Sequence, residues 1–232
     1  MWIQGIISAL IAYLIGSIPT AFLVTRLRTG KDIRTIGSGN VGANNVWTNV
    51  GKISAVVVAV VDILKGIAAV ILAQIIILNE VSMGKDIAVV DMLLFLMLAG
   101  IAAVVGHIWP FSLKFRGGNG IAPVLGVLLV LMTREVLIAI AITILIIAIT
   151  RNPVLSVNIA LFFTIPIAGG LMHAGMAWAY VTFALILIVI MVFNYIPTFK
   201  TALAEAGSRE KLIAQLMRIE PEKPVKKKKK KK

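Results

Sequence analysis

Long apolar runs, separated by short polar stretches, dominate this chain. Several of them approach or exceed the roughly 20 residues that an α-helix needs to cross the hydrocarbon core of a bilayer. The pattern predicts an all-α, polytopic transmembrane bundle of about seven spans, with five or six as the alternative because the fourth and fifth are short. The predicted spans are Ile3–Thr25, Ile53–Leu78, Ile87–Gly106, Gly120–Met132, Leu137–Thr150, Val154–Met172 and Met176–Ile196.

Composition supports an integral membrane protein. Of the 232 residues, 59% are hydrophobic, and the mean hydropathy is +1.00, whereas soluble domains are about 45–50% apolar. The chain has no cysteine, which excludes disulfides and thiol chemistry. Its two histidines, His107 and His173, are far apart in sequence, so we expect no metal site.

The basic residues predict an orientation. With seven spans and the N-terminus outside, twenty of the 23 Lys and Arg residues fall on the cytoplasmic side, as the positive-inside rule requires. We therefore expect a transmembrane domain over residues 1–199 and a cytoplasmic basic tail over residues 200–232. The net charge of +13 is interpreted as a topology signal, and no nucleic-acid partner is expected.

The tail ends in the run Lys226–Lys232. Near an anionic bilayer surface each lysine contributes about 1 kcal/mol of attraction, so membrane lipid is one candidate partner. A disordered tail without a specific role is the alternative.

A Gly/Asn-rich loop follows the first predicted span and is the strongest candidate for a binding site. Glycine leaves backbone N–H groups unobstructed, and successive N–H groups form a concave nest for anions. A helix that begins just after the loop would add its positive dipole end. An ordinary turn is the alternative. The candidate phosphate-binding residues here are Arg34, Gly37, Ser38, Gly39, Asn40, Gly42 and Asn45.

A second glycine-rich loop follows the third predicted span. Its candidate phosphate-binding residues are Arg116, Gly117, Gly118, Asn119 and Gly120. Under the predicted topology both loops reach the cytoplasmic face, so we expect them to form one polar pocket. A flexible, cationic interfacial loop is the alternative.

Two spans carry further ionisable residues. Asp62 and Lys65 are three residues apart and share one helical face. They form either a mutually neutralising pair between helices or a cation held near an anionic substrate. His107 lies at the end of the third span beside the second loop, where it is either a hydrogen-bonded interfacial residue or a catalytic one.

These segments resemble the bacterial membrane acyl-phosphate:glycerol-3-phosphate acyltransferases. The resemblance covers about half of the chain. Four segments match in order and spacing: Gly16–Thr20, Arg34–Val46, Asp62–Gly66 and Gly106–Gly120. The family consists of seven-span bundles with a cytoplasmic active site, which agrees with the predicted topology and implies a multi-pass protein of a bacterial cell membrane.

The resemblance implies transfer of a fatty acyl group from acyl phosphate to the 1-hydroxyl of glycerol 3-phosphate, yielding 1-acylglycerol 3-phosphate for phospholipid synthesis. The candidate catalytic residues are Ser38, Lys65 and His107, with Ser38 binding phosphate rather than acting as a nucleophile. No cofactor is implied, and the enzyme that forms the acyl phosphate is a further candidate partner.

The chain also departs from the family pattern. Asn44 replaces a threonine, Thr48 an arginine, Asn119 a lysine and Pro123 a threonine, and the segment Phe193–Pro197 lacks the family's His-Arg…Asn cluster. These changes keep a second hypothesis open: a catalytically impaired paralogue that binds lipid or acyl phosphate, or regulates an active homologue. A small transporter is a third hypothesis, opposed by the absence of inverted-repeat symmetry.

Overall fold

The structure, a computed structural model, describes residues 2–151, 153–173, 175–206 and 208, and these residues form helices and loops without a strand. The predicted basic tail, apart from its first residues, lies outside them. The elements are α1 (Trp2–Gly16), α2 (Thr20–Thr29), η1 (Ile33–Thr35), α3 (Ala43–Asn49), α4 (Lys52–Ser82), α5 (Val89–Ile108), η2 (Phe111–Leu113), α6 (Ile121–Leu131), α7 (Thr133–Thr150), α8 (Pro153–Ile159), η3 (Ala160–Thr164), α9 (Ile165–Met172) and α10 (Ala177–Ala206).

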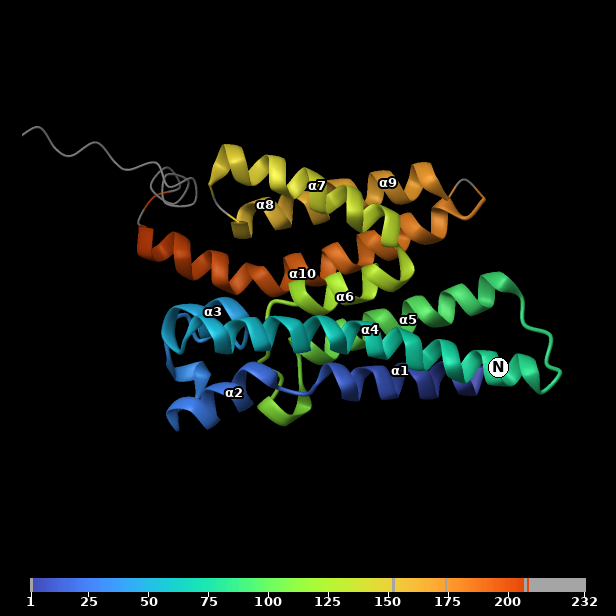
Figure 1. The fold of residues 1–232 in the computed structure, drawn as a ribbon, viewed down its shortest axis with the longest axis horizontal. Coiled ribbons are helices and arrows are strands. Elements are labelled where there is room, and N and C mark those ends of the chain that lie inside the picture. Colours follow the sequence, from blue (N-terminus) through green and yellow to red (C-terminus); the bar gives the residue numbers. More distant parts are fainter. Residues whose placement is uncertain (1, 152, 174, 207, 209–232) are drawn as a thin grey trace, which may run out of the picture.

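The helices run back and forth along one axis, as a polytopic bundle requires (Figure 1). Within the described residues, six helical segments are long and apolar enough to cross a membrane, and α6, with 11 residues, is a shorter apolar helix between them. The end of α10 lies opposite the N-terminus (Figure 1). The predicted bundle is therefore confirmed, with α6 as a short seventh segment. Which end faces the cytoplasm stays a prediction.

The first predicted span is broken rather than continuous. Helix α1 ends at Gly16 and α2 begins at Thr20. Pro19 has no N–H group to donate and disfavours helical backbone at Ile18 before it. The break exposes carbonyl oxygens inside the bundle, and another helix must satisfy them.

The polar stretch between the first two predicted spans also contains more helix than expected. Helix α2 continues to Thr29, α3 forms within the Gly/Asn-rich loop, and α4 already begins at Lys52. His107 lies in the last turn of α5, at the end of the third predicted span.

Helices α1, α4, α5 and α6 pack closely because glycines stand at their crossings. In α1 the buried residues are small and recur at helical spacing: Gly5, Ser8, Ala12 and Gly16. A Cβ atom at Gly16 would overlap the carbonyl of Ala103 in α5, and one at Gly126 would overlap the carbonyl of Ile63 in α4. The helix backbones are therefore in direct contact.

The remaining helices, α7 to α10, form the other side of the bundle, with α6 between the two groups (Figure 1). The sixth predicted span comprises α8, the π-turn η3 and α9. Pro166, in the first turn of α9, removes one N–H group from the helical ladder, and such defects accompany π-turns.

Candidate functional site

The amide of Asn45 organises the first loop from within. Its Nδ2 donates to the carbonyl oxygens of Ile33 (3.3 Å), Ile36 (3.0 Å) and Asn40 (3.0 Å). Its Oδ1 accepts from the backbone N–H of Ser38 at 3.3 Å. Asn45 is only 3% exposed, so it shapes the loop while its own polar atoms face protein.

Two glycines of this loop adopt backbone conformations that few other residues tolerate. Gly37 has φ +54° and Gly39 has φ +71°. Ser38, between them, is exposed, and its Oγ accepts from the backbone N–H of Asn40 at 3.4 Å. Gly42 is extended and leads directly into α3. The loop thereby turns Asn40 and Gly42 towards the interior.

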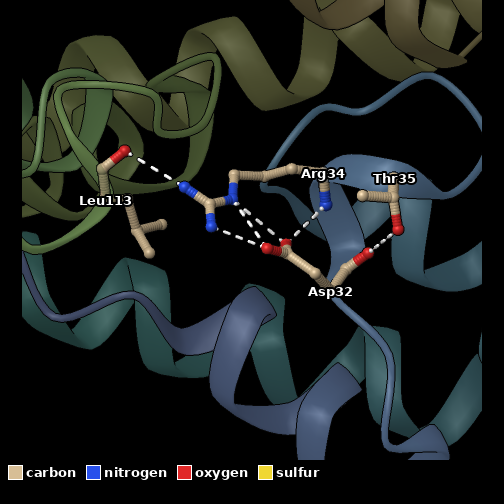
Figure 2. Close-up of polar contacts among 4 residues, drawn as sticks. All are labelled: Asp32, Arg34, Thr35 and Leu113. Atoms are coloured by element: carbon tan, nitrogen blue, oxygen red, sulfur yellow. Dashed lines mark hydrogen bonds and ion pairs between the residues drawn. The ribbon is translucent and has the colours of Figure 1, made fainter.

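Arg34 ties the first loop to the second (Figure 2). Its guanidinium donates to both carboxylate oxygens of Asp32, at 2.6 to 3.1 Å, and to the carbonyl of Leu113 at 3.3 Å. The hydrogen bonds from Arg34 lower the pKa of the Asp32 carboxyl, and the carboxylate raises the pKa of Arg34. This charge-assisted pair holds the relative position of the two loops.

The second loop folds back onto the end of α5. The backbone N–H groups of Gly117 and Gly118 donate to the carbonyls of Ile108 (3.0 Å) and His107 (3.1 Å). A Cβ atom at Gly118 would overlap the His107 ring and would lie 2.7 Å from the carbonyl of Val41 in the first loop. Glycine at position 118 therefore lets the two loops and the histidine meet.

Asp62 and Lys65 form a buried ion pair in α4. Lys65 Nζ lies 2.7 Å from Asp62 Oδ1 and donates to the carbonyls of Ile18 (2.6 Å) and Gly16 (3.4 Å). The ammonium therefore donates two hydrogen bonds to carbonyls and forms an ion pair with the carboxylate. Lys65 thus satisfies the carbonyls of the break between α1 and α2, while His107 Nδ1 lies 3.8 Å from the same Asp62 oxygen.

A cavity of about 240 Å³ lies where the two loops meet α4 and α5. The first loop, the second loop and the start of α6 all line it, and Asp62 and His107 complete its wall. The lining residues are Asn40, Gly42, Ala43, Asn44, Ala59, Asp62, His107, Asn119, Gly120, Ile121 and Ala122. The sequence-based expectation of one pocket shared by both loops therefore describes the observed geometry.

The predicted site residues divide into two groups. Asn40, Gly42, His107, Asn119 and Gly120 line the cavity, whereas the other predicted residues stand outside its described lining. Among those outside, Lys65, Arg34 and Asn45 hold the framework, Arg116 is exposed, and Gly117 and Gly118 pack on α5.

Sequence reasoning left Asp62 and Asn44 out of the candidate set. Asp62 was recognised by its charge within an apolar span, but only Lys65 of that pair was taken as a candidate site residue. Asn44 carried no separate signal, since only the start of α3 turns it to the cavity.

Fold and site together define a multi-pass membrane protein with a cavity between two glycine-rich loops, whose mainly apolar wall carries three asparagines, Asp62 and His107. The sequence model of the family described as glycerol-3-phosphate acyltransferase matches residues 6–205. Glycerol-3-phosphate acyltransferase 2 of Dehalococcoides mccartyi strain 195 is 38% identical over 206 residues, covering 89% of this chain and 90% of the relative. Glycerol-3-phosphate acyltransferase 1 of that strain is 39% identical over 160 residues, covering 67% of this chain and 71% of the relative.

Two crystal structures of PlsY, an integral membrane glycerol 3-phosphate acyltransferase, have similar folds. The glycerol 3-phosphate form has a TM-score of 0.69 and 28% identity, and the lysophosphatidic acid form has 0.67 and 26%. Each comparison covers 87% of this chain and 92% of the other. The chain therefore belongs to the glycerol-3-phosphate acyltransferase family, and it is a multi-pass acyltransferase of a bacterial cell membrane.

Proposed function

We propose that the protein transfers a fatty acyl group from acyl phosphate to the 1-hydroxyl of glycerol 3-phosphate, giving 1-acylglycerol 3-phosphate in phospholipid biosynthesis. The observation that carries this proposal is the cavity that joins both glycine-rich loops to Asp62 and His107. Family membership supports the choice of substrates.

The chemistry requires positioning more than activation. The acceptor oxygen attacks the acyl carbon, the bond from that carbon to the phosphate oxygen breaks, and the hydroxyl proton leaves with the phosphate. An acyl phosphate is already activated, so orientation of the two substrates and stabilisation of developing charge supply most of the acceleration. No cofactor takes part in these steps.

Residues of the cavity wall would make these contacts. Asn40 and Asn119 offer amide N–H donors to substrate oxygens. His107 stands at the wall within reach of a bound acceptor, whereas Lys65 acts as a positioning residue because its ammonium neutralises Asp62 and holds the α1–α2 break. Ser38 supports the cavity through the backbone of Asn40.

The decisive experiment is acyl transfer by the purified protein in detergent, with palmitoyl phosphate and labelled glycerol 3-phosphate, beside a sample without protein. Labelled 1-acylglycerol 3-phosphate is the expected product. Its absence from a folded, monodisperse sample would reject the proposal.

A pair of variants tests the first loop in the same assay. We expect Ser38→Ala to reduce turnover without unfolding the protein, because the loop loses one internal hydrogen-bond acceptor. Ser82→Ala, at the distant end of α4, removes an exposed hydroxyl that bonds only to its own helix and should leave turnover unchanged. Equal turnover in both variants would remove Ser38 from the mechanism.

The second candidate is a non-catalytic paralogue that binds acyl phosphate or lipid. One observation favours it: the described residues that line the cavity include neither Lys nor Arg. Retained binding of palmitoyl phosphate without product formation would select this function. In either case, the enzyme that makes the acyl phosphate is a proposed partner, because it would supply this ligand.

A further inference from the structure

We infer that the acceptor pocket is charge-neutral and takes uncharged polyols such as glycerol alongside glycerol 3-phosphate. The inference rests on the proposed acyl transfer and concerns only which acceptor the cavity selects.

The lining of the cavity contains amides where a strongly phosphate-selective site would need cations. Asn40, Asn44 and Asn119 contribute three side-chain amides, and Asp62 is the only carboxylate in the described lining. The charge of Asp62 is matched by Lys65 at 2.7 Å. The described wall therefore offers a dianionic phosphate hydrogen-bond donors but no net positive charge.

The two cations that hold the framework are engaged elsewhere. Lys65 forms an ion pair with Asp62 and donates to two carbonyls of the α1–α2 break. Arg34 is held by Asp32 and by Leu113. Neither cation can turn to a ligand without leaving a buried carboxylate unpaired or separating the two loops.

The asparagine amides suit hydroxyl groups. Within the described part of the chain, the side chains of Asn40 and Asn44 have no hydrogen-bond partner, so both amides are free for a ligand. An amide donates and accepts, as a hydroxyl does, whereas an ionised phosphate only accepts. A charge-assisted contact would add about 10- to 100-fold selectivity for phosphate, and the described lining supplies no such contact.

Acylation of glycerol needs no further reactant. The glycerol oxygen bonds to the acyl carbon, the carbon–oxygen bond to phosphate breaks, and the hydroxyl proton departs on the phosphate. The products are a monoacylglycerol and inorganic phosphate, so atoms and charge balance as in the reaction with glycerol 3-phosphate.

The test compares kcat/KM for glycerol and glycerol 3-phosphate with the full chain and palmitoyl phosphate in one detergent. We expect a preference for glycerol 3-phosphate below about 100-fold, the most that one charge-assisted contact supplies. A larger preference overturns the inference and means that a cation from outside the described lining serves the site. Transfer to neither acceptor would reject the proposed function and, with it, this inference.

A gain-of-charge variant sharpens the result. Asn119→Lys places an ammonium at the cavity wall and should raise the preference for glycerol 3-phosphate by about 10-fold or more, through a lower KM. Asn79→Lys adds the same charge at the exposed far end of α4 and should leave the preference unchanged. If Asn119→Lys does not fold, Asn44→Lys at the exposed rim replaces it. A folded cavity variant with an unaltered preference overturns the inference.

Discussion

The helices around α4 and the helices around α9 are packed in different ways. On the α4 side, glycines bring helix backbones into contact, as Gly126 does against Ile63. On the α9 side, apolar side chains line a cavity of about 130 Å³ and an open groove of about 340 Å³. The share of buried residues does not separate the two sides: it is 39% both in the α4 span and in the span Leu155–Met172, and it is lowest, at 17%, in α7.

Their polar contacts differ as well. The α4 side contains a connected set of loop, carboxylate and ammonium contacts that surrounds the candidate site. The α7–α10 side contains the pair His173 Nε2 to Glu135 Oε1 at 2.7 Å, with Tyr180 stacked on the histidine at 3.7 Å. The connected polar contacts hold the α4 side, whereas the α7–α10 side depends mainly on apolar packing. The comparison therefore indicates where substitutions should be most damaging.

The largest effect is expected for Lys65→Met. Removal of the ammonium leaves Asp62 buried without its partner and two carbonyls without a donor, which should cost about 3–5 kcal/mol. Thermal unfolding in detergent measures the loss. Lys85→Met is the matched control, because Lys85 pairs with Glu80 at an exposed position where such pairs contribute about 0–1 kcal/mol. Equal losses in the two variants would contradict the assigned role of Lys65.

Gly126→Ala should follow, with a loss of about 1–3 kcal/mol from overpacking. Its new methyl group would meet the backbone of α4, which cannot move aside locally. Gly169→Ala in α9 is the control, since its methyl group would meet the flexible end of Met132 at 2.7 Å. The comparison between the two sides fails if both alanines are tolerated equally in the same unfolding assay.

Ala139→Leu tests the opposite property of the α7–α10 side. Ala139 is buried and lines the 130 Å³ apolar cavity. Filling that space should leave the protein folded and add about 0.5–2 kcal/mol of stability. A strong destabilisation, seen as a lower unfolding temperature, would mean that this side is as tightly packed as the other.

The smallest effect concerns the pH dependence of stability that arises from the ion pair between Asp32 and Arg34. The pKa of Asp32 is lowered because Arg34 donates to its carboxylate. The pair therefore stabilises the protein fully above the unfolded-state pKa of about 3.9, and this stabilisation is lost as the pH falls through the lower folded-state value. Asp32→Asn should remove up to about 1 kcal/mol at neutral pH and flatten the acid limb of the stability profile. An unchanged limb would exclude this pair as its source.

Much of the fold could be predicted because membrane spans are encoded locally. Apolar length alone marked the long helices, and Gly and Asn marked both loops. The break at Ser17–Pro19 was missed because Pro19 can also occur within a helix when its neighbours satisfy the freed carbonyl. In the folded protein, the carbonyl of Ile18 accepts from Lys65, which lies 47 residues further along the chain in another helix. Only the tertiary structure reveals this contact.

The sequence by itself determined that the chain is a polytopic helical membrane protein, that two polar loops belong to one site, and which family it resembles. The first two features follow from local composition and spacing, and the resemblance follows from four matching segments. The tertiary structure alone decided which residues face the cavity. Arg34 and Asn45, expected to bind phosphate, make contacts within the protein, whereas Asp62 and Asn44 line the cavity. The physical reason is that helix crossings and glycine contacts orient side chains, and those contacts join residues that are far apart in the chain.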